Sequence, residues 1–241
     1  MCDFVLECID INPHMLERGR TLAREAGVTA QVLPQQIDFN AWQPQYSYDA
    51  VIANQSLHHV LDLEILFDTI LAALAPHGVF ITSDMIGRNG HQRWPEAQMI
   101  VDEFWNELPQ HYRYNVQLNR QENEFLDWDC AQEGFEGIRA QDVLPLLLER
   151  FGFEFFLGFA NIIDPFIDRS FGHHFNADAD WDREFIDRVH ARDEEEILSG
   201  RIKPTHMLAV MRKNYSGATA CWKHLTPQFC MRMPDQSDNS Q

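Results

Sequence analysis

The chain has 241 residues, 45% of them hydrophobic, which is enough to bury the core of one large domain. Its 37 acidic and 19 basic side chains give a net charge of −18, which argues against nucleic acids and anionic membranes as partners. Five scattered cysteines without a CxxC pair argue against a disulfide framework or a zinc–cysteine site. No signal peptide or membrane-spanning run is recognisable in the sequence, so the expected location is the cytoplasm.

The first predicted element is a buried strand that ends in an acid. Residues 5–9 are mostly apolar, Asp10 ends the run, and Pro13 suits the first turn of a helix expected over residues 15–26. Ligands of open α/β sheets bind beyond the carboxyl ends of the strands, so Asp10 is well placed to accept hydrogen bonds from a ribose. The alternative is that Asp10 caps the helix, alone or with Asn12.

The next strands bring two more polar side chains to the same predicted edge. We expect strands over residues 28–33 and 48–54, with Asp38 after the first and Asn54 at the end of the second. Further helices and strands alternate over residues 61–75, 79–84, 141–151, 152–163 and 205–212. This alternation predicts a Rossmann-like α/β fold with a doubly wound, mostly parallel sheet.

Two segments interrupt the alternation. Residues 85–139 are polar and rich in aromatic side chains, and residues 164–203 contain a charged helix. We expect both to form a helical cap over the site, because insertions at this edge commonly form lids. The irregular spacing of the aromatic residues favours packing within the cap, with a substrate pocket as the alternative. The acidic run 193–196 is expected to be a solvated helix face, and residues 214–241 a partly disordered tail.

Four stretches carry a family resemblance when they are taken in order: DINPHML, QQIDF, YDAVIANQSLHHV and ILAALAPHGVFITSD. Together they resemble the class I S-adenosylmethionine-dependent methyltransferases, especially the small-molecule type with a Leu-His-His segment after the fourth strand. The similarity is close over residues 4–84 and looser over 147–153. It implies a methyltransferase-like domain over residues 1–213, with S-adenosyl-L-methionine as cofactor and a small molecule as acceptor.

The resemblance also implies a set of cofactor-binding residues. Asp10 would bind the ribose hydroxyls, Asp38 the adenine amino group, and Asn54 would face the methionine part and the methyl group. The apolar members would pack near the adenosine. The full set is Asp10, Ile11, Met15, Asp38, Phe39, Asn54 and Gln55.

One part of the family pattern is missing before Asp10. The glycine-rich loop of such a site normally lies about twenty residues upstream of the acid, whereas only nine residues precede Asp10. In the family that this chain resembles, the loop follows a first strand that lies at the centre of the sheet. The absence of this strand and its loop is expected to expose two sheet edges. The leading interpretation is an N-terminally truncated enzyme with impaired activity. A rearranged sheet, in which the second strand slides against the fourth, is the structural alternative, and a non-catalytic remnant or partner-binding module is the functional one.

Histidines are the candidate catalytic bases, because an oxygen nucleophile benefits from a nearby base and imidazole titrates near neutrality. His58 and His59 follow the fourth family strand, and His173 lies in the second insertion; His91 and His174 are further candidates. Loop packing is the alternative role. A metal site built from the His173 and His174 pair with Asp178 and Asp180 is disfavoured, so no metal is predicted. A nicotinamide dehydrogenase is disfavoured too, because it leaves the Leu-His-His segment unexplained.

Overall fold

The main sheet of the computed structural model, which describes residues 4–232, contains five strands in the order β3-β4-β8-β7-β9. β3 is parallel to β4 and β9 is parallel to β7, whereas β8 is antiparallel to both of its neighbours. The α/β class predicted from the sequence is therefore confirmed, with β8 as the reversed strand. The strand bounds are Tyr48–Asn54 (β3), Leu74–Met85 (β4), Gly152–Phe159 (β7), His206–Arg212 (β8) and Ala220–Cys221 (β9).

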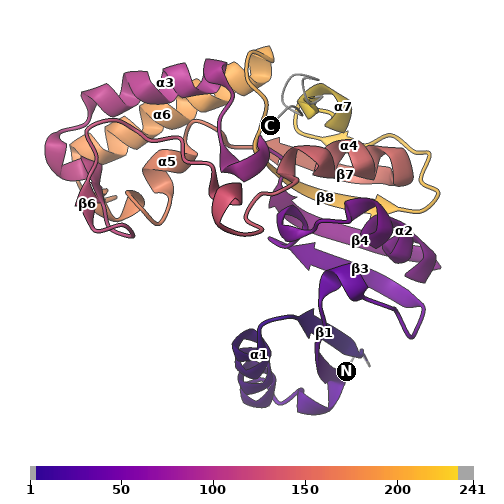
Figure 1. The fold of residues 1–241 in the computed structure, drawn as a ribbon. Coiled ribbons are helices and arrows are strands. Elements are labelled where there is room, and N and C mark those ends of the chain that lie inside the picture. The colour runs from indigo at the N-terminus through magenta and orange to yellow at the C-terminus, as the bar shows by residue number, and fades with distance from the viewer. Residues whose placement is uncertain (1–3, 233–241) are drawn as a thin grey trace.

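A second, separate sheet consists of β1, Leu6–Asp10, and β2, Val32–Gln36, which pair in parallel. Figure 1 shows this ribbon and helix α1 lying apart from the main sheet, on the side of β3. Within residues 4–232, β1 does not pair with β3, so the alternative in which these strands slide together is wrong. The two expected edges are present among the described residues, because β1 pairs only with β2 and β3 only with β4.

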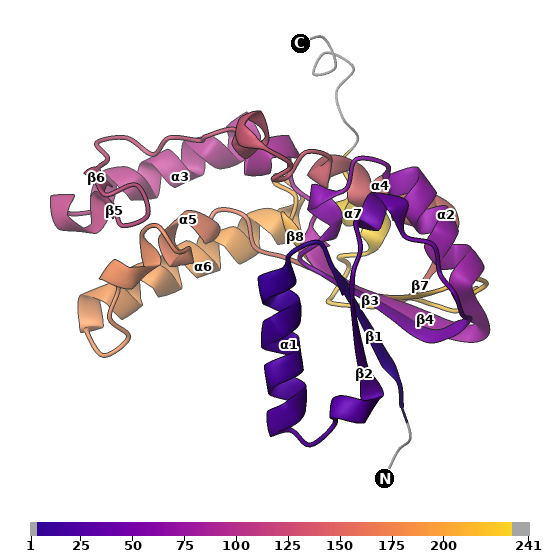
Figure 2. The same cartoon turned by 60° about the horizontal axis from the view of Figure 1, so that its bottom comes forward.

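Helix α1, Pro13–Glu25, packs against the β1–β2 ribbon, as Figure 2 shows. The side chain of Asn12 caps the helix by accepting the N–H of His14 at 2.9 Å. The chain leaves the helix through Gly27, whose φ of +70° lies in the left-handed region that glycine adopts without strain. The turn that follows Asp10 is therefore fixed by local capping before any ligand is considered.

Helices α2, Leu63–Ala73, and α4, Ala140–Arg150, pack together against the main sheet. Three phenylalanine rings join them to β4. The ring centroid of Phe80 is 6.4 Å from that of Phe67 and 5.4 Å from that of Phe151. Contacts of this kind hold β4, and with it the acid at its carboxyl end, in a fixed position.

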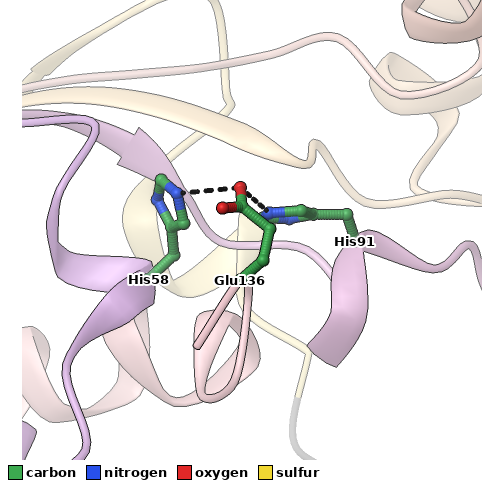
Figure 3. A group of neighbouring side chains, drawn as sticks. All are labelled: His58, His91 and Glu136. Atoms are coloured by element: carbon green, nitrogen blue, oxygen red, sulfur yellow. Dashed lines mark hydrogen bonds and ion pairs between the residues drawn. The ribbon is translucent and has the colours of Figure 1, made fainter. Parts of the chain in front are cut away.

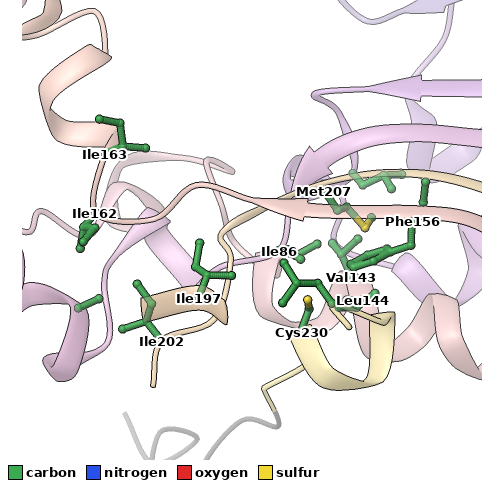
Figure 4. Close-up of a cluster of buried hydrophobic side chains, with 14 of the residues drawn as sticks. Ile86, Val143, Leu144, Phe156, Ile162, Ile163, Ile197, Ile202, Met207 and Cys230 are labelled. Carbon is green, nitrogen blue, oxygen red and sulfur yellow. The ribbon is translucent and has the colours of Figure 1, made fainter. Parts of the chain in front are cut away.

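The C-terminal part of the described chain also packs on this core, although its sequence lacks periodicity. Helix α7, Pro227–Cys230, buries the side chain of Cys230, which Figure 4 shows beside Val143 and Leu144 of α4. The final residues of the expected tail, 233–241, lie outside the described residues.

The two insertions form a helical lobe beside the carboxyl end of the main sheet (Figure 1, Figure 2). Its long helices lie side by side, and the ring centroids of Phe104 and Phe185 are 6.0 Å apart between them. Trp105 is buried in the lobe, as expected for packing, whereas Trp128 is 56% exposed. The lobe contains α3 (Pro95–Glu107), β5 (Tyr114–Asn115), β6 (Arg120–Gln121), α5 (Asp164–Ile167) and α6 (Asp180–Ser199).

Among residues 4–232, no helix combines the length and apolar character needed to cross a membrane.

The acidic run of α6 is not a solvated face, so that expectation is wrong for two of its residues. Asp193 and Glu196 are buried. The Asp193 carboxylate accepts the backbone N–H groups of Asn161 at 3.2 Å and Ile162 at 2.9 Å, which ties α6 to the segment after β7. Burial raises the pKa of Asp193 to about 7, although these two amides act in the opposite direction.

Candidate functional site

Asp10 lies where the sequence places it, at the carboxyl end of β1. Its Oδ1 accepts the backbone N–H of Asn12 at 2.7 Å, while the side chain of Asn12 performs the helix capping. Among residues 4–232, no hydrogen bond to Oδ2 is present, so this oxygen can still accept one. A cavity of about 180 Å³ adjoins it and is lined by Cys8, Ile9, Asp10, Met15, Leu16, Gly19, Val32 and Pro34. A carboxylate acceptor beside a hollow of this kind fits the hydroxyls of a ribose.

The other predicted cofactor residues are spread over neighbouring elements. Asp38 is exposed and accepts the N–H of Asn40 at 3.0 Å, while Phe39 packs against the main core. Asn54 and Gln55 are exposed at the end of β3, where Gln55 donates its N–H to Ser83 at 2.8 Å.

Of this predicted set, the cavity brings together Asp10 and Met15 but leaves out Ile11, which is 60% exposed. Gln55 has a φ of +49°, an uncommon backbone conformation for a residue other than glycine, which marks a fixed turn after β3. Because β1 and β3 belong to different sheets, a ligand that touches both Asp10 and Asn54 has to bridge them.

A buried carboxylate organises the loop that follows this turn. Asp84, at the end of β4, accepts the backbone N–H groups of Ser56 at 2.8 Å, Leu57 at 2.8 Å and His58 at 3.3 Å. It also lies 2.6 Å from Nδ1 of His58. The single turn of 3-10 helix at Leu57–His59 is thus wrapped around one acid.

The charge state of Asp84 fixes the orientation of the His58 ring. Burial acts to raise the pKa of Asp84, but the hydrogen bond and charge of His58 and the Leu57 and Ser56 amides outweigh it, so this pKa lies below its ordinary value. An ionised carboxylate only accepts hydrogen bonds, so His58 Nδ1 is the donor. The other ring nitrogen, Nε2, points toward Glu136, as Figure 3 shows.

Glu136 lies among three histidines. Its Oε1 is 2.9 Å from Nε2 of His91 and 3.5 Å from Nε2 of His58, and its Oε2 is 3.5 Å from Nδ1 of His59. We call His58, His91 and Glu136 the His–Glu cluster; Figure 3 shows the three side chains converging from separate segments. Burial lowers the pKa of His91, although Glu136 acts in the opposite direction.

Close backbone contacts hold the three segments of this cluster. Gly90 donates its N–H to the carbonyl of Gly137 at 2.9 Å, and Ile138 donates its N–H to that of His58 at 3.1 Å. A Cβ at Gly137 would lie only 2.9 Å from Cε1 of His91, so this approach requires glycine. His91 itself has a φ of +58°, an unfavourable conformation that the surrounding contacts maintain.

The cluster can serve two kinds of chemistry. A histidine whose Nδ1 is held by a carboxylate can take up a proton at Nε2. The ligand atoms of His58, His91 and Glu136 also lie within 4.8 Å of one another, which makes this the one metal-competent group among the described residues. His173 does not join it: this exposed residue lies in the helical lobe, in the turn Gly172–His174.

Sequence reasoning missed Glu136 and gave His91 no special place, because 33 residues separate His58 from His91 and 45 separate His91 from Glu136. No local spacing motif links them. The available signals were Gly90 and Gly137, two glycines that permit the close approach of their segments.

A second cavity, of about 550 Å³, lies between the end of β7, α5 and α6. Its wall includes His206, which pairs with Met85, the residue directly after Asp84. The cavity therefore adjoins the same edge of the main sheet as the His–Glu cluster. Most of its lining is apolar, with Asp164, His190, Asp193 and His206 among the polar groups.

Comparison with known proteins supports the family resemblance of the N-terminal part. Residues 2–80 match the model of a family described as a methyltransferase domain. No curated protein matches the chain.

The chain is also similar to solved structures, two of which were determined with S-adenosyl-L-homocysteine. An O-methyltransferase from a trans-AT PKS multienzyme of Brevibacillus brevis is 13% identical, with 87% of this chain and 58% of that chain covered and a TM-score of 0.46. The N-methyltransferase NodS of Bradyrhizobium japonicum is 12% identical, with 88% and 67% covered and a TM-score of 0.45. The chain thus spans 58% of the Brevibacillus structure, and neither likeness assigns it a substrate.

Proposed function

We propose that this chain, whose residues 2–80 match the model of a methyltransferase-domain family, transfers a methyl group from S-adenosylmethionine to a small-molecule acceptor. The observation that carries the proposal beyond the family is the 2.6 Å contact between His58, in the loop after β3, and Asp84, near the end of β4. When bound, S-adenosylmethionine supplies a methyl group activated by a sulfonium. The chain has to hold this cofactor, orient the acceptor and remove the acceptor's proton.

His58 is the proposed general base. Its Nε2 takes the proton of an acceptor hydroxyl, while Asp84 keeps the proton on Nδ1 and stabilises the imidazolium that forms. General bases of this kind typically contribute 10²–10⁴-fold to a rate. His59, whose ring centroid is 4.0 Å from that of His58, is the proposed neighbour that holds Glu136 rather than a second base. His173 has no catalytic part in this proposal.

Asp10 and Met15 are the proposed contacts for the ribose and adenosine, which their shared cavity supports. Asp38 and Phe39 are proposed for the adenine, and Asn54 and Gln55 for the methionine end. The described residues offer side chains rather than a glycine-rich loop for this cofactor, so weak binding is proposed, in line with an impaired enzyme. The cavity of about 550 Å³ supports a small acceptor of largely apolar character.

Calorimetry with S-adenosylhomocysteine tests the cofactor assignment. Asp10→Asn keeps an oxygen for the N–H of Asn12 but removes the charge, so we expect affinity to fall about 10–100-fold, the worth of a charge-assisted hydrogen bond. Asp49→Asn is the matched control, because Asp49 is an exposed acid at the opposite end of β3. Equal affinity of the Asp10→Asn and unmodified chains contradicts the ribose role. No binding by any variant favours a non-catalytic module.

A further inference from the structure

We propose that the His–Glu cluster is a binding site for one divalent transition-metal ion of the zinc type. The ligand atoms are Nε2 of His58, Nε2 of His91 and Oε1 of Glu136, all within 4.8 Å of one another. The site itself rests on the geometry of these residues, and only its effect on the general base rests on the proposed function.

The separations suit a small tetrahedral ion. Metal–ligand distances of 2.0–2.2 Å place neighbouring ligand atoms roughly 3.3 Å apart around zinc. Oε1 of Glu136 is 2.9 Å from Nε2 of His91 and 3.5 Å from Nε2 of His58, which brackets this value. The two imidazole nitrogens lie within 4.8 Å of each other, so the three side chains have to draw together around the ion.

Asp84 supplies the outer-shell contact that such a site needs. Histidine ligands of metals usually donate their second ring nitrogen to a carboxylate, which fixes the tautomer and strengthens the ligand. The 2.6 Å contact between His58 Nδ1 and the fully buried Asp84 provides this arrangement. The Gly90–Gly137 hydrogen bond and the strained backbone of His91 hold the second histidine in place.

The donor set selects the class of ion. Two imidazoles and one carboxylate suit Zn²⁺, Co²⁺ or Ni²⁺, whereas Mg²⁺ and Ca²⁺ prefer oxygen ligands. Three protein ligands leave a fourth position open for water or another oxygen. The Glu136 side chain is 49% exposed, so this position is accessible from solvent.

Metal binding and proton uptake compete for the same atom. The lone pair of His58 Nε2 either coordinates the ion or accepts a proton, so an occupied site withdraws His58 from the general-base role.

The test is titration of the full, tag-free, chelator-treated chain with Zn²⁺ by calorimetry, without cofactor or acceptor. We expect one ion per chain, and a loss of affinity of more than 100-fold in both His91→Ala and Glu136→Gln. Asp84→Asn changes only the outer shell and is expected to lose about 10–100-fold. Circular dichroism checks that each variant is folded.

His173→Ala is the matched control, because it removes a histidine from the paired site considered in the sequence while leaving the His–Glu cluster intact. Its affinity for Zn²⁺ is expected to equal that of the unmodified chain. Co²⁺ substitution adds a spectroscopic readout, since nitrogen and oxygen ligands lack the charge-transfer absorption of thiolates. Absence of Zn²⁺ binding, thiolate absorption, or affinity unchanged in folded His91→Ala and Glu136→Gln overturns the proposal.

Discussion

Nδ1 of His58 lies 2.6 Å from Oδ1 of Asp84, and the same carboxylate accepts the backbone N–H groups of Ser56 and Leu57. One buried acid at the end of β4 therefore sets both the path of the loop after β3 and the tautomer of its histidine. Substitution of Asp84 therefore tests both the local folding of this loop and the chemistry of His58.

Replacement of Asp84 is expected to destabilise the fold. Asp84→Ala leaves the N–H groups of Leu57 and His58 buried without an acceptor, at about 1–3 kcal/mol each. Urea unfolding should show a lower midpoint than for the unmodified chain, and Asp84→Asn should lose less because it keeps an acceptor oxygen. Asp49→Ala, at an exposed position, should change the unfolding free energy by less than about 0.5 kcal/mol. Equal stability of Asp84→Ala and Asp49→Ala would contradict the organising role of this acid.

Gly137→Ala is expected to damage the His–Glu cluster specifically. Gly137 has a φ of +66°, and an added Cβ would lie 3.0 Å from Nδ1 of His91. Gly27→Ala is a matched control, because Gly27 has a φ of +70° but no atom within 4 Å of the added Cβ. Both variants should lose about 1–2 kcal/mol of stability from backbone strain. Only Gly137→Ala should also weaken Zn²⁺ binding; a similar affinity for both variants argues against the tight approach of this loop to His91.

Zinc is expected to stabilise the folded chain by mass action. At a free Zn²⁺ concentration 100 times the Kd, the free energy of unfolding should rise by about 2.7 kcal/mol. Thermal unfolding with and without Zn²⁺ measures this as an upward shift in Tm. The shift should disappear in Glu136→Gln and persist in His173→Ala. The reverse result would indicate that the metal binds in the helical lobe, and it would contradict the proposal.

Stability should fall with rising pH because of Asp193. Its pKa is about 7 in the folded chain and ordinary in the unfolded chain, so between about pH 4 and 7 the unfolded state loses this proton first. The stabilisation that the protonated Asp193 carboxyl adds to the free energy of unfolding is thus complete below about pH 4, and it is lost as pH rises through 7. The unfolding free energy of the unmodified chain minus that of Asp193→Asn should decline across this window by a few kcal/mol. A difference that stays constant with pH contradicts the raised pKa.

Strong local patterns made much of the fold predictable. The strand Tyr48–Asn54 matches its expected bounds, because a continuous apolar run is preceded by Asp49 and followed by Asn54. The expected strand 28–33 begins only at Val32, because Val28 still donates its N–H to Ala23 and closes the end of α1. The β-branched residues in this segment suggest a strand, but residues 28–31 instead form the end of α1 and a 3-10 turn.

The candidate site was predictable only where it is local in sequence. His58 and His59 were found from the segment after β3, whereas Glu136 reaches them from a loop more than 75 residues away. The burial of Asp193 and Glu196 escaped prediction because a run of four acids shows no periodicity, although a spacing of three residues places both on one helix face. Tertiary contacts, rather than composition, decide such positions.

The central claim is tested most directly by a crystal structure of the full chain with S-adenosylhomocysteine. The account predicts that the ribose hydroxyls lie within hydrogen-bond distance of the Asp10 carboxylate and that the sulfur end points toward Asn54 and the loop carrying His58. Electron density for the ligand elsewhere, with Asp10 engaged only by Asn12, would contradict it.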